Sequence, residues 1–248
     1  MPVTILVLTV ILAACIFLAY VGRHRIAVLI KRPVYDLFHY YYYRDSLTTW
    51  GNTAWMGVPL LKLPMDLWTY QEIIHDTKPD LIVETGTNRG GSALYFANLC
   101  DIAGRGRIIT VDISAPPVEA PQHPRIEYII GSSTSPEVLE RIRSNIQPGE
   151  RVMVVLDSDH SEPHVRRELD LYSPLVTPGC YLVVEDTNVN GHPVFRSHGP
   201  GPMEALNDFL ATNKEFSIDL SREKFRITFS PRGWLKRNAS AAGAATNR

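Results

Sequence analysis

The spacing of apolar residues divides the chain into three parts. Residues 3–22, "VTILVLTVILAACIFLAYVG", form an uninterrupted apolar run without a charged side chain. Residues 63–80 carry apolar positions at helical spacing up to Lys78-Pro79, where a helix should end. From residue 81 to residue 237, short apolar runs alternate with amphipathic segments. The pattern predicts an apolar N-terminal helix followed by a domain of alternating strands and helices.

The short apolar runs beyond residue 80 have the composition of buried strands. The runs expected to be strands are 81–85, 107–113, 125–131, 151–157, 179–186, 216–220 and 225–230. The segments expected to be helices are 90–103, 135–146, 161–176 and 202–213. Continuous apolar strands that alternate with helices are typical of a parallel sheet covered by helices on both faces. The expected fold class is therefore α/β with a mostly parallel sheet.

Acidic residues stand where the apolar runs end, on the side of a parallel sheet that binds ligands. Four of the first five runs end in a carboxylate, and the other ends in Gly131-Ser132-Ser133. The acids are Glu84, Asp112, Asp157, Glu185 and Asp186. Scattered surface acids would not coincide with strand ends so regularly, so we expect these side chains to belong to one site.

The first strand end continues into a glycine turn, "ETGTNRGG" at 84–91. Glycines permit positive φ and close approach of the backbone to a ligand. The turn is neither a G-x-G-x-x-G dinucleotide loop nor a P-loop, because neither spacing is present. Glu84 would repel a pyrophosphate but suits an ammonium group, and Asp112 can accept both hydroxyls of a ribose. S-adenosylmethionine fits this pair better than NAD; a plain tight turn and a turn-forming Asp112 are the alternatives.

Three further acids suggest a metal site. Asp157, Glu185 and Asp186 end two strands that can be neighbours, so their oxygens could converge on one hard cation. Oxygen ligands favour Mg²⁺ or Mn²⁺, and a divalent ion would offset the mutual repulsion of three close carboxylates. His160 lies three residues beyond Asp157, and an imidazole titrates in the range of a general base. We therefore expect the three acids to be metal ligands and His160 to be catalytic.

Composition and charge narrow the class of protein. Of the 248 residues, 45% are hydrophobic and 21% are charged, and the net charge of −1 gives no sign of a nucleic-acid footprint. The three cysteines contain no C-x-x-C pair, which argues against a zinc knuckle or a disulfide framework.

The N-terminal apolar run is long enough to cross a bilayer, because about 20 apolar residues span a hydrocarbon core of roughly 30 Å. Basic residues follow between Arg23 and Arg32, a flank that favours a cytoplasmic location for the rest of the chain. We therefore expect a single-pass membrane protein with a cytoplasmic catalytic domain; a cleaved signal peptide and a buried core helix are the alternatives. The expected divisions are a transmembrane anchor at 1–22, a juxtamembrane or cap segment at 23–63, the catalytic domain at 64–237 and a disordered tail at 238–248.

Five motifs, taken in order, resemble the cephalosporin hydroxylase family. They are "VETGTNRGGSALYFA", "VDI", "LDSDH", "LVVEDT" and "GPGPMEAL", and the similarity covers roughly residues 45–229. The resemblance implies a Rossmann-like class I methyltransferase fold at 64–237. Because the family includes rhamnosyl O-methyltransferases, it also implies an O-methyltransferase that uses S-adenosylmethionine.

A more distant similarity to the metal-dependent catechol O-methyltransferase group implies roles for single residues. Asp157 matches the aspartate that ends one strand there, and Glu185 with Asp186 matches the Mg²⁺-binding pair that ends the next. That group has a lysine base three residues beyond the metal aspartate, where this chain has His160. The cofactor residues that the similarity implies are Glu84 and Gly86 at the methionine end, Asp112 at the ribose, and Gly131, Ser132 and Ser133 at the adenine.

The sequence as a whole predicts a metal-assisted O-methyltransferase. Its expected partners are S-adenosylmethionine, Mg²⁺ or Mn²⁺, a sugar or other small or lipid-linked acceptor, and the membrane through the N-terminal helix. The Gly/Pro-rich segment 189–206 is an expected lid or acceptor wall. Two alternatives remain: a non-haem iron oxygenase, in which His192 or His198 would have to join His160, and a non-catalytic membrane-bound binding protein.

Overall fold

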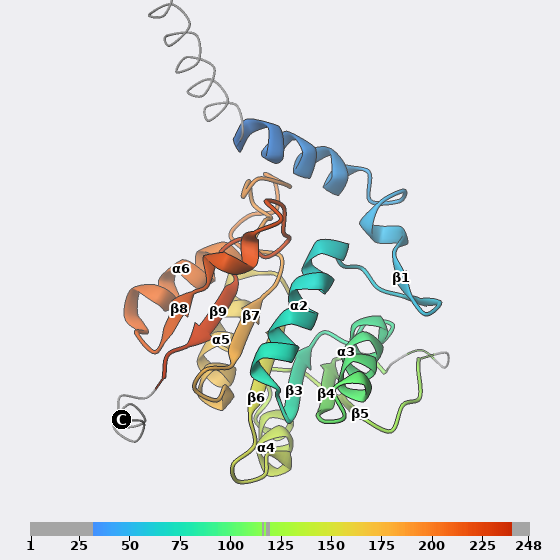
Figure 1. Cartoon of the computed structure of the whole chain (residues 1–248). Helices are drawn as coiled ribbons and strands as arrows, with labels where there is room; N and C mark the ends of the chain where they lie inside the picture. Colours follow the sequence, from blue (N-terminus) through green and yellow to red (C-terminus); the bar gives the residue numbers. More distant parts are fainter. Residues whose placement is uncertain (1–31, 116, 118–119, 240–248) are drawn as a thin grey trace, which may run out of the picture.

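A seven-stranded sheet forms the centre of the domain in the computed structural model, which describes residues 32–115, 117 and 120–239 (Figure 1). Its strands are β3 (Leu81–Thr85), β4 (Arg107–Asp112), β5 (Ile126–Ile130), β6 (Val152–Leu156), β7 (Tyr181–Val184), β8 (Phe216–Ile218) and β9 (Trp234–Arg237). Their spatial order is β5-β4-β3-β6-β7-β9-β8. The strands from β5 to β7 are parallel to their neighbours, and β9 is antiparallel to β7 and β8. The predicted α/β class with a mostly parallel sheet is confirmed.

Helices cover both faces of the sheet. The helices on one face are α2 (Pro64–Thr77) and α3 (Gly91–Ile102), and those on the other are α4 (Pro136–Asn145), α5 (Glu162–Tyr172) and α6 (Pro202–Thr212). Because side chains alternate along a strand, β6 directs Val152, Val154 and Leu156 toward α4, α5 and α6. Met153 and Val155 point to the opposite core. Each face buries its own core, which is why the strands read as continuous apolar runs.

The last strand differs from the prediction. Residues 225–230 do not form a strand, and β9 lies at Trp234–Arg237 instead. Ile227 and Phe229 of this segment are buried in a separate cluster with Leu63, whereas Phe225 is exposed. Ile227 and Phe229 alternate with polar residues because another part of the chain buries them. A two-residue period in the sequence cannot distinguish such a segment from a strand.

The segment packed around Phe229 is residues 32–63, which we call the N-terminal cap. Residues 32–44 are helical and are followed by a 3₁₀ turn, η1 (Trp50–Asn52), and by a hairpin of β1 (Ala54–Trp55) and β2 (Val58–Pro59). The rings of Tyr42, Tyr43 and Trp50 lie 5.5–6.4 Å from that of Phe229, centroid to centroid, the range of favourable aromatic contacts. These contacts hold the cap against the domain.

The hairpin of the cap lies beside α3 (Figure 1). A Cβ at Gly91 would lie only 2.2 Å from the carbonyl oxygen of Pro59, so this approach requires glycine. Trp55 secures the same contact, because its Nε1 donates a 2.8 Å hydrogen bond to Asn98 and its ring packs edge-on against Tyr95.

The predicted transmembrane anchor at 1–22 lies outside the described residues, as does the expected tail from residue 240 onward. Among the helices that the structure describes, none has the length and apolar character needed to cross a bilayer. For example, the 14 residues of α2 extend about 21 Å, less than the roughly 30 Å of a hydrocarbon core. This finding corrects the prediction of a single-pass membrane protein with a cytoplasmic catalytic domain, and with it the predicted membrane contact.

Asp66 links α2 to the Phe229 loop and makes stability depend on pH. Its buried carboxylate accepts the Phe229 N–H at 2.8 Å, and burial raises its pKa from 3.8 to about 7. The folded protein therefore holds this proton more tightly than the unfolded chain, so Asp66 destabilises the fold increasingly as pH rises from about 4 to about 7.

Asp66→Asn keeps an acceptor for the Phe229 N–H but cannot ionise. We expect stability unchanged near pH 4 and raised near pH 8 by as much as ~4 kcal/mol, since one pKa unit corresponds to about 1.4 kcal/mol. Urea unfolding of both proteins at the two pH values measures this difference. An equal gain at both pH values would show that Asp66 is not the titrating group.

Candidate functional site

The carboxyl ends of β3 and β6 meet where the strand order reverses, the point at which open α/β sheets bind ligands. A cavity of about 620 Å³ opens there, within the range of roughly 300–1,000 Å³ that is typical of ligand sites. The predicted site residues that line it are Gly86, Asp112, Ser132, Ser133, Asp157, His160 and Asp186. Glu84 and Glu185 are buried and do not line it. The structure thus brings seven of the predicted site residues to one cavity and leaves Glu84 and Glu185 outside its lining.

The glycine turn after β3 packs directly on the backbone that follows β6. Gly86 has φ +92°, and a Cβ there would lie 1.8 Å from the carbonyl oxygen of Asp157. No other residue fits this contact, so Gly86 fixes the spacing between the turn and Asp157.

Glu84 lies beneath this turn and holds it through a chain of hydroxyl groups. The Thr110 hydroxyl donates to Glu84 Oε2 at 2.7 Å, and it lies 2.7 Å from the hydroxyl of Thr87 in the turn. Burial raises the pKa of Glu84 to about 7. Its other oxygen, Oε1, is buried and has no hydrogen-bond partner within the described residues. An unpartnered buried acceptor of this kind suits a cationic ligand group.

Asp112 fixes the neighbouring wall of the cavity. Its Oδ2 accepts the Asn88 N–H at 3.0 Å, and its Oδ1 accepts the Ser114 N–H at 2.9 Å. The carboxylate is thereby oriented at the end of β4, and each oxygen keeps capacity for a further donor.

A polar network lies at the predicted adenine end. The hydroxyls of Ser133 and Ser158 each lie 3.1 Å from His164 Nε2, and Ser158 donates to the buried Glu168 at 2.8 Å. The hydrogen bond to Glu168 raises the pKa of His164. Ser158 and His164, which the motif analysis did not single out, also line the cavity.

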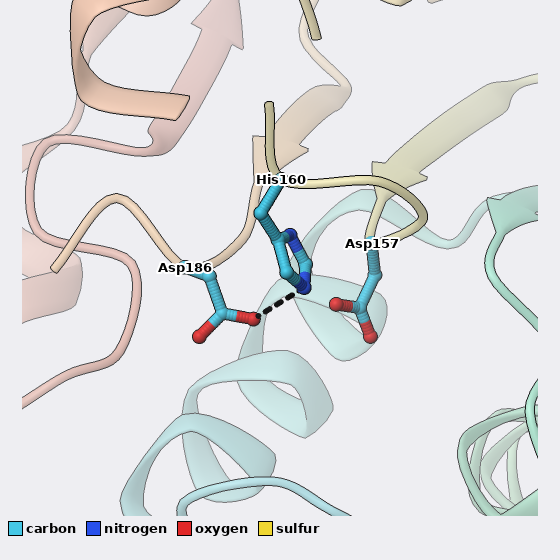
Figure 2. A group of neighbouring side chains, drawn as sticks. All are labelled: Asp157, His160 and Asp186. Carbon is cyan, nitrogen blue, oxygen red and sulfur yellow. Dashed lines mark ion pairs between the residues drawn. The ribbon is translucent and has the colours of Figure 1, made fainter. Parts of the chain in front are cut away.

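Asp157, His160 and Asp186 form one group in the same cavity. One ligand atom from each lies within 4.8 Å of the other two. Figure 2 shows the imidazole between the two carboxylates, with His160 Nε2 3.2 Å from Asp186 Oδ2. Asp157 directly follows β6, and Asp186 follows β7 with φ +51°, a conformation that aspartate tolerates better than most residues.

Glu185 is not part of this group, because its carboxylate forms an ion pair with Lys62 of the cap. The Lys62 side chain is 4% exposed, and its Nζ lies 2.6 Å from Asp157 Oδ2 and 2.7 Å from Glu185 Oε1. The Tyr70 hydroxyl also donates to Glu185 Oε1. Lys62 therefore joins the ends of β6 and β7 from outside the sheet.

The electrostatics of this end favour binding of a cation. Burial raises the pKa values of Asp157, Glu185 and Asp186, while Lys62 acts in the opposite direction on all three. Burial lowers the pKa of His160, but the neighbouring carboxylates outweigh it and the net pKa is raised. Three carboxylates thus share one ammonium and one imidazole.

The donor set fits a divalent ion. The two carboxylates suit Mg²⁺ that keeps bound water, and the imidazole beside them would also suit a first-row metal. The two-histidine, one-carboxylate set of an iron oxygenase does not form within the described residues, since His160 is the one histidine in the group. His192 lies 2.9 Å from Glu204 instead.

Sequence reasoning missed the residues that the cap contributes. Lys62 stood out in principle, because it is the one charge in the apolar stretch "VPLLKLPM" and lysine is rarely buried unless paired. Tyr43 and Trp50 line the cavity but carry no local signal for it. Residues 189–206, all of them described, contribute no lining residue, so the expected lid or acceptor wall does not form part of this cavity.

Comparisons with known proteins agree with this architecture. Residues 48–238 match the family Rhamnosyl O-methyltransferase/CmcI. The rhamnosyl O-methyltransferase of Mycobacterium leprae is 42% identical over 221 residues, which cover 84% of this chain and 94% of the relative. That of Mycobacterium tuberculosis H37Rv is 40% identical over 222 residues, covering 86% and 89%.

Two solved structures of CmcI share the fold. An apo structure superposes with a TM-score of 0.59 at 22% identity, over 77% of this chain and 78% of that chain. A structure with Mg and SAM gives a TM-score of 0.57 at 21% identity, over 76% and 78%. The predicted class I methyltransferase fold is confirmed.

Lys62→Met removes the buried ammonium while keeping the length of the side chain. The buried Glu185 and the part-buried Asp157 then lose their cation, so we expect a loss of ~3–5 kcal/mol in the free energy of unfolding. Added Mn²⁺ should reduce this loss, because a divalent ion restores positive charge. Urea unfolding with and without Mn²⁺ measures both effects.

Lys224→Met is the matched control. Lys224 pairs with Glu72 but is 46% exposed, and exposed pairs contribute about 0–1 kcal/mol. Equal losses in the two variants would contradict the role assigned to Lys62.

Proposed function

The chain belongs to the Rhamnosyl O-methyltransferase/CmcI family, and on this basis we propose that it transfers the methyl group of S-adenosylmethionine to a sugar hydroxyl with the help of Mg²⁺. Family membership confirms the predicted enzyme class, an O-methyltransferase. The observation that carries the proposal is that a single cavity is lined both by the glycine turn with Asp112 and by the Asp157–His160–Asp186 group.

The cofactor would bind at the sheet end of the cavity. Gly86 lets the backbone approach the methionine part, and Glu84, buried directly beneath the turn, would favour its ammonium group electrostatically. Asp112 would accept the ribose hydroxyls. Ser132 and Ser133 would contact the adenine.

Asp157 and Asp186 would hold Mg²⁺ or Mn²⁺, and Glu185 would become the predicted third carboxylate ligand by exchanging Lys62 for the ion. A bound divalent ion lowers the pKa of a hydroxyl and orients it. The acceptor oxygen forms a bond to the methyl carbon as the carbon–sulfur bond breaks, which leaves S-adenosylhomocysteine. His160 Nε2 takes the hydroxyl proton, and Asp186, 3.2 Å away, stabilises the imidazolium.

The acceptor would present one sugar to this site. Relatives named rhamnosyl O-methyltransferases support a sugar acceptor. A cavity of about 620 Å³ that also takes the cofactor is small for a whole glycolipid, so a lipid-linked acceptor would insert its sugar alone.

Variants that lose cofactor binding or metal binding, but not both, test the assignment of these residues. We expect Asp112→Ala to weaken S-adenosylmethionine binding by ~1.5–3 kcal/mol and to leave Mn²⁺ binding unchanged. Asp157→Asn and Asp186→Asn should lose Mn²⁺ binding and keep that of the cofactor, because different strand ends hold the two. Isothermal titration calorimetry measures both affinities in each of the three variants.

Asp159→Asn is the matched control for the metal, since Asp159 Oδ1 accepts the Ser161 N–H at 2.8 Å and lies outside the metal group. Wild-type Mn²⁺ affinity in Asp157→Asn would refute the metal site. Wild-type cofactor affinity in Asp112→Ala would move the ribose contact elsewhere.

A further inference from the structure

We propose that Tyr43 and Trp50 of the N-terminal cap form the subsite for the acceptor sugar. In this subsite the two rings support the apolar face of a 6-deoxyhexopyranoside, and the Tyr43 hydroxyl binds a sugar hydroxyl. The inference rests on the proposed function, because it assigns the acceptor end of the same cavity.

The cavity has walls of two origins. Residues that follow β3, β4 and β5 of the sheet line the predicted cofactor side. Cap residues also line the cavity: Pro59 and Leu60 pack beside Gly91 at the start of α3, whereas Tyr43 stacks on Trp50 and lies near Asp186. Asp157, His160 and Asp186 line the same cavity. A methyl acceptor must meet the cofactor at this acid group, so we assign to it the part of the cap nearest Asp186.

The two aromatic rings are held in place before any ligand binds. Their centroids lie 5.2 Å apart at an interplanar angle of 27°. Phe229 packs edge-on against both, at 5.5 Å from Tyr43 and 5.6 Å from Trp50. Trp50 Nε1 donates to the Tyr43 carbonyl at 3.0 Å. Because this N–H is already used, Trp50 offers the cavity an apolar ring surface, which suits the C–H face of a pyranose.

Tyr43 adds a polar group next to the reacting centre. Its hydroxyl makes no hydrogen bond to the residues that the structure describes, although the side chain lines the cavity. Burial, and then the nearby charge of Asp186, raise its pKa to about 12. The hydroxyl therefore stays protonated beside Asp186 and is available as a donor to a second sugar hydroxyl.

A separate contact fixes the cap to the strand end that carries Asp186. Asn188 follows Asp186 by two residues, and its Nδ2 lies 3.0 Å from Nε2 of the buried His39 in the cap helix. His39 in turn stacks on Phe229 at 5.6 Å. The aromatic wall and the acid group are thus held in a fixed relation, as recognition of one sugar hydroxyl among several requires.

Tyr43→Phe is the sharpest test, because it keeps the ring and removes one oxygen. With methyl α-L-rhamnopyranoside as acceptor, we expect KM to rise about five- to tenfold, the effect of losing one neutral hydrogen bond, with kcat nearly unchanged. Trp50→Leu keeps apolar bulk but removes the ring, and should raise KM by at least about tenfold. Calorimetric affinity for S-adenosylmethionine should be unchanged in both variants.

Matched controls come from cap aromatics that do not line the cavity. Tyr42→Phe and Tyr41→Phe should leave KM at the wild-type value. A rise in these controls equal to that in Tyr43→Phe and Trp50→Leu would indicate general loosening of the cap and overturn the subsite.

A binding measurement separates this inference from the proposed function. Saturation-transfer NMR with methyl α-L-rhamnopyranoside should show contact of the ring C–H protons with wild-type protein and lose it in Trp50→Leu. No contact with the wild-type protein, or equal contact in Trp50→Leu, overturns the subsite. Failure of wild-type protein to bind S-adenosylmethionine would instead overturn the proposed function, while the NMR result still decides the sugar contact.

Discussion

The site depends on one buried ammonium between two strand ends. Lys62, 4% exposed, pairs with Asp157 after β6 and with Glu185 after β7. Because an unpaired buried charge is very costly, the carboxylates need the cap as much as the lysine needs the carboxylates. The same pairing brings the rest of the cap to the carboxyl ends of the strands, where Tyr43 and Trp50 line the cavity.

This dependence gives the two ends of the cavity different physical origins. Backbone geometry builds the cofactor end, where Gly86 packs on the backbone of Asp157 and Asp112 is oriented by two N–H groups. Charge and aromatic packing between distant segments build the other end. A methyl transfer needs little covalent chemistry from the protein, so holding cofactor, ion and acceptor in line is the main contribution expected of such a site.

The sequence predicts what is local. Apolar runs located β3 to β7, and the rule that ligands bind at the carboxyl ends of strands selected Asp157 and Asp186. The sequence did not predict the direction of individual side chains or the contacts between distant segments. Glu185 sits next to Asp186 in sequence, yet Lys62 and Tyr70 hold it behind the cavity. Phe229 was assigned to a strand, because its burial by the cap depends on residues almost two hundred positions earlier.

The most direct test of the account is to follow the methyl group itself. The full-length chain is incubated with S-adenosylmethionine carrying a radiolabelled methyl group, methyl α-L-rhamnopyranoside and Mg²⁺, and the products are separated by chromatography. The account predicts label in a methyl ether of the sugar, an equal amount of S-adenosylhomocysteine, and loss of both when EDTA removes the ion. Label that never reaches the sugar, or transfer that EDTA does not reduce, would contradict it.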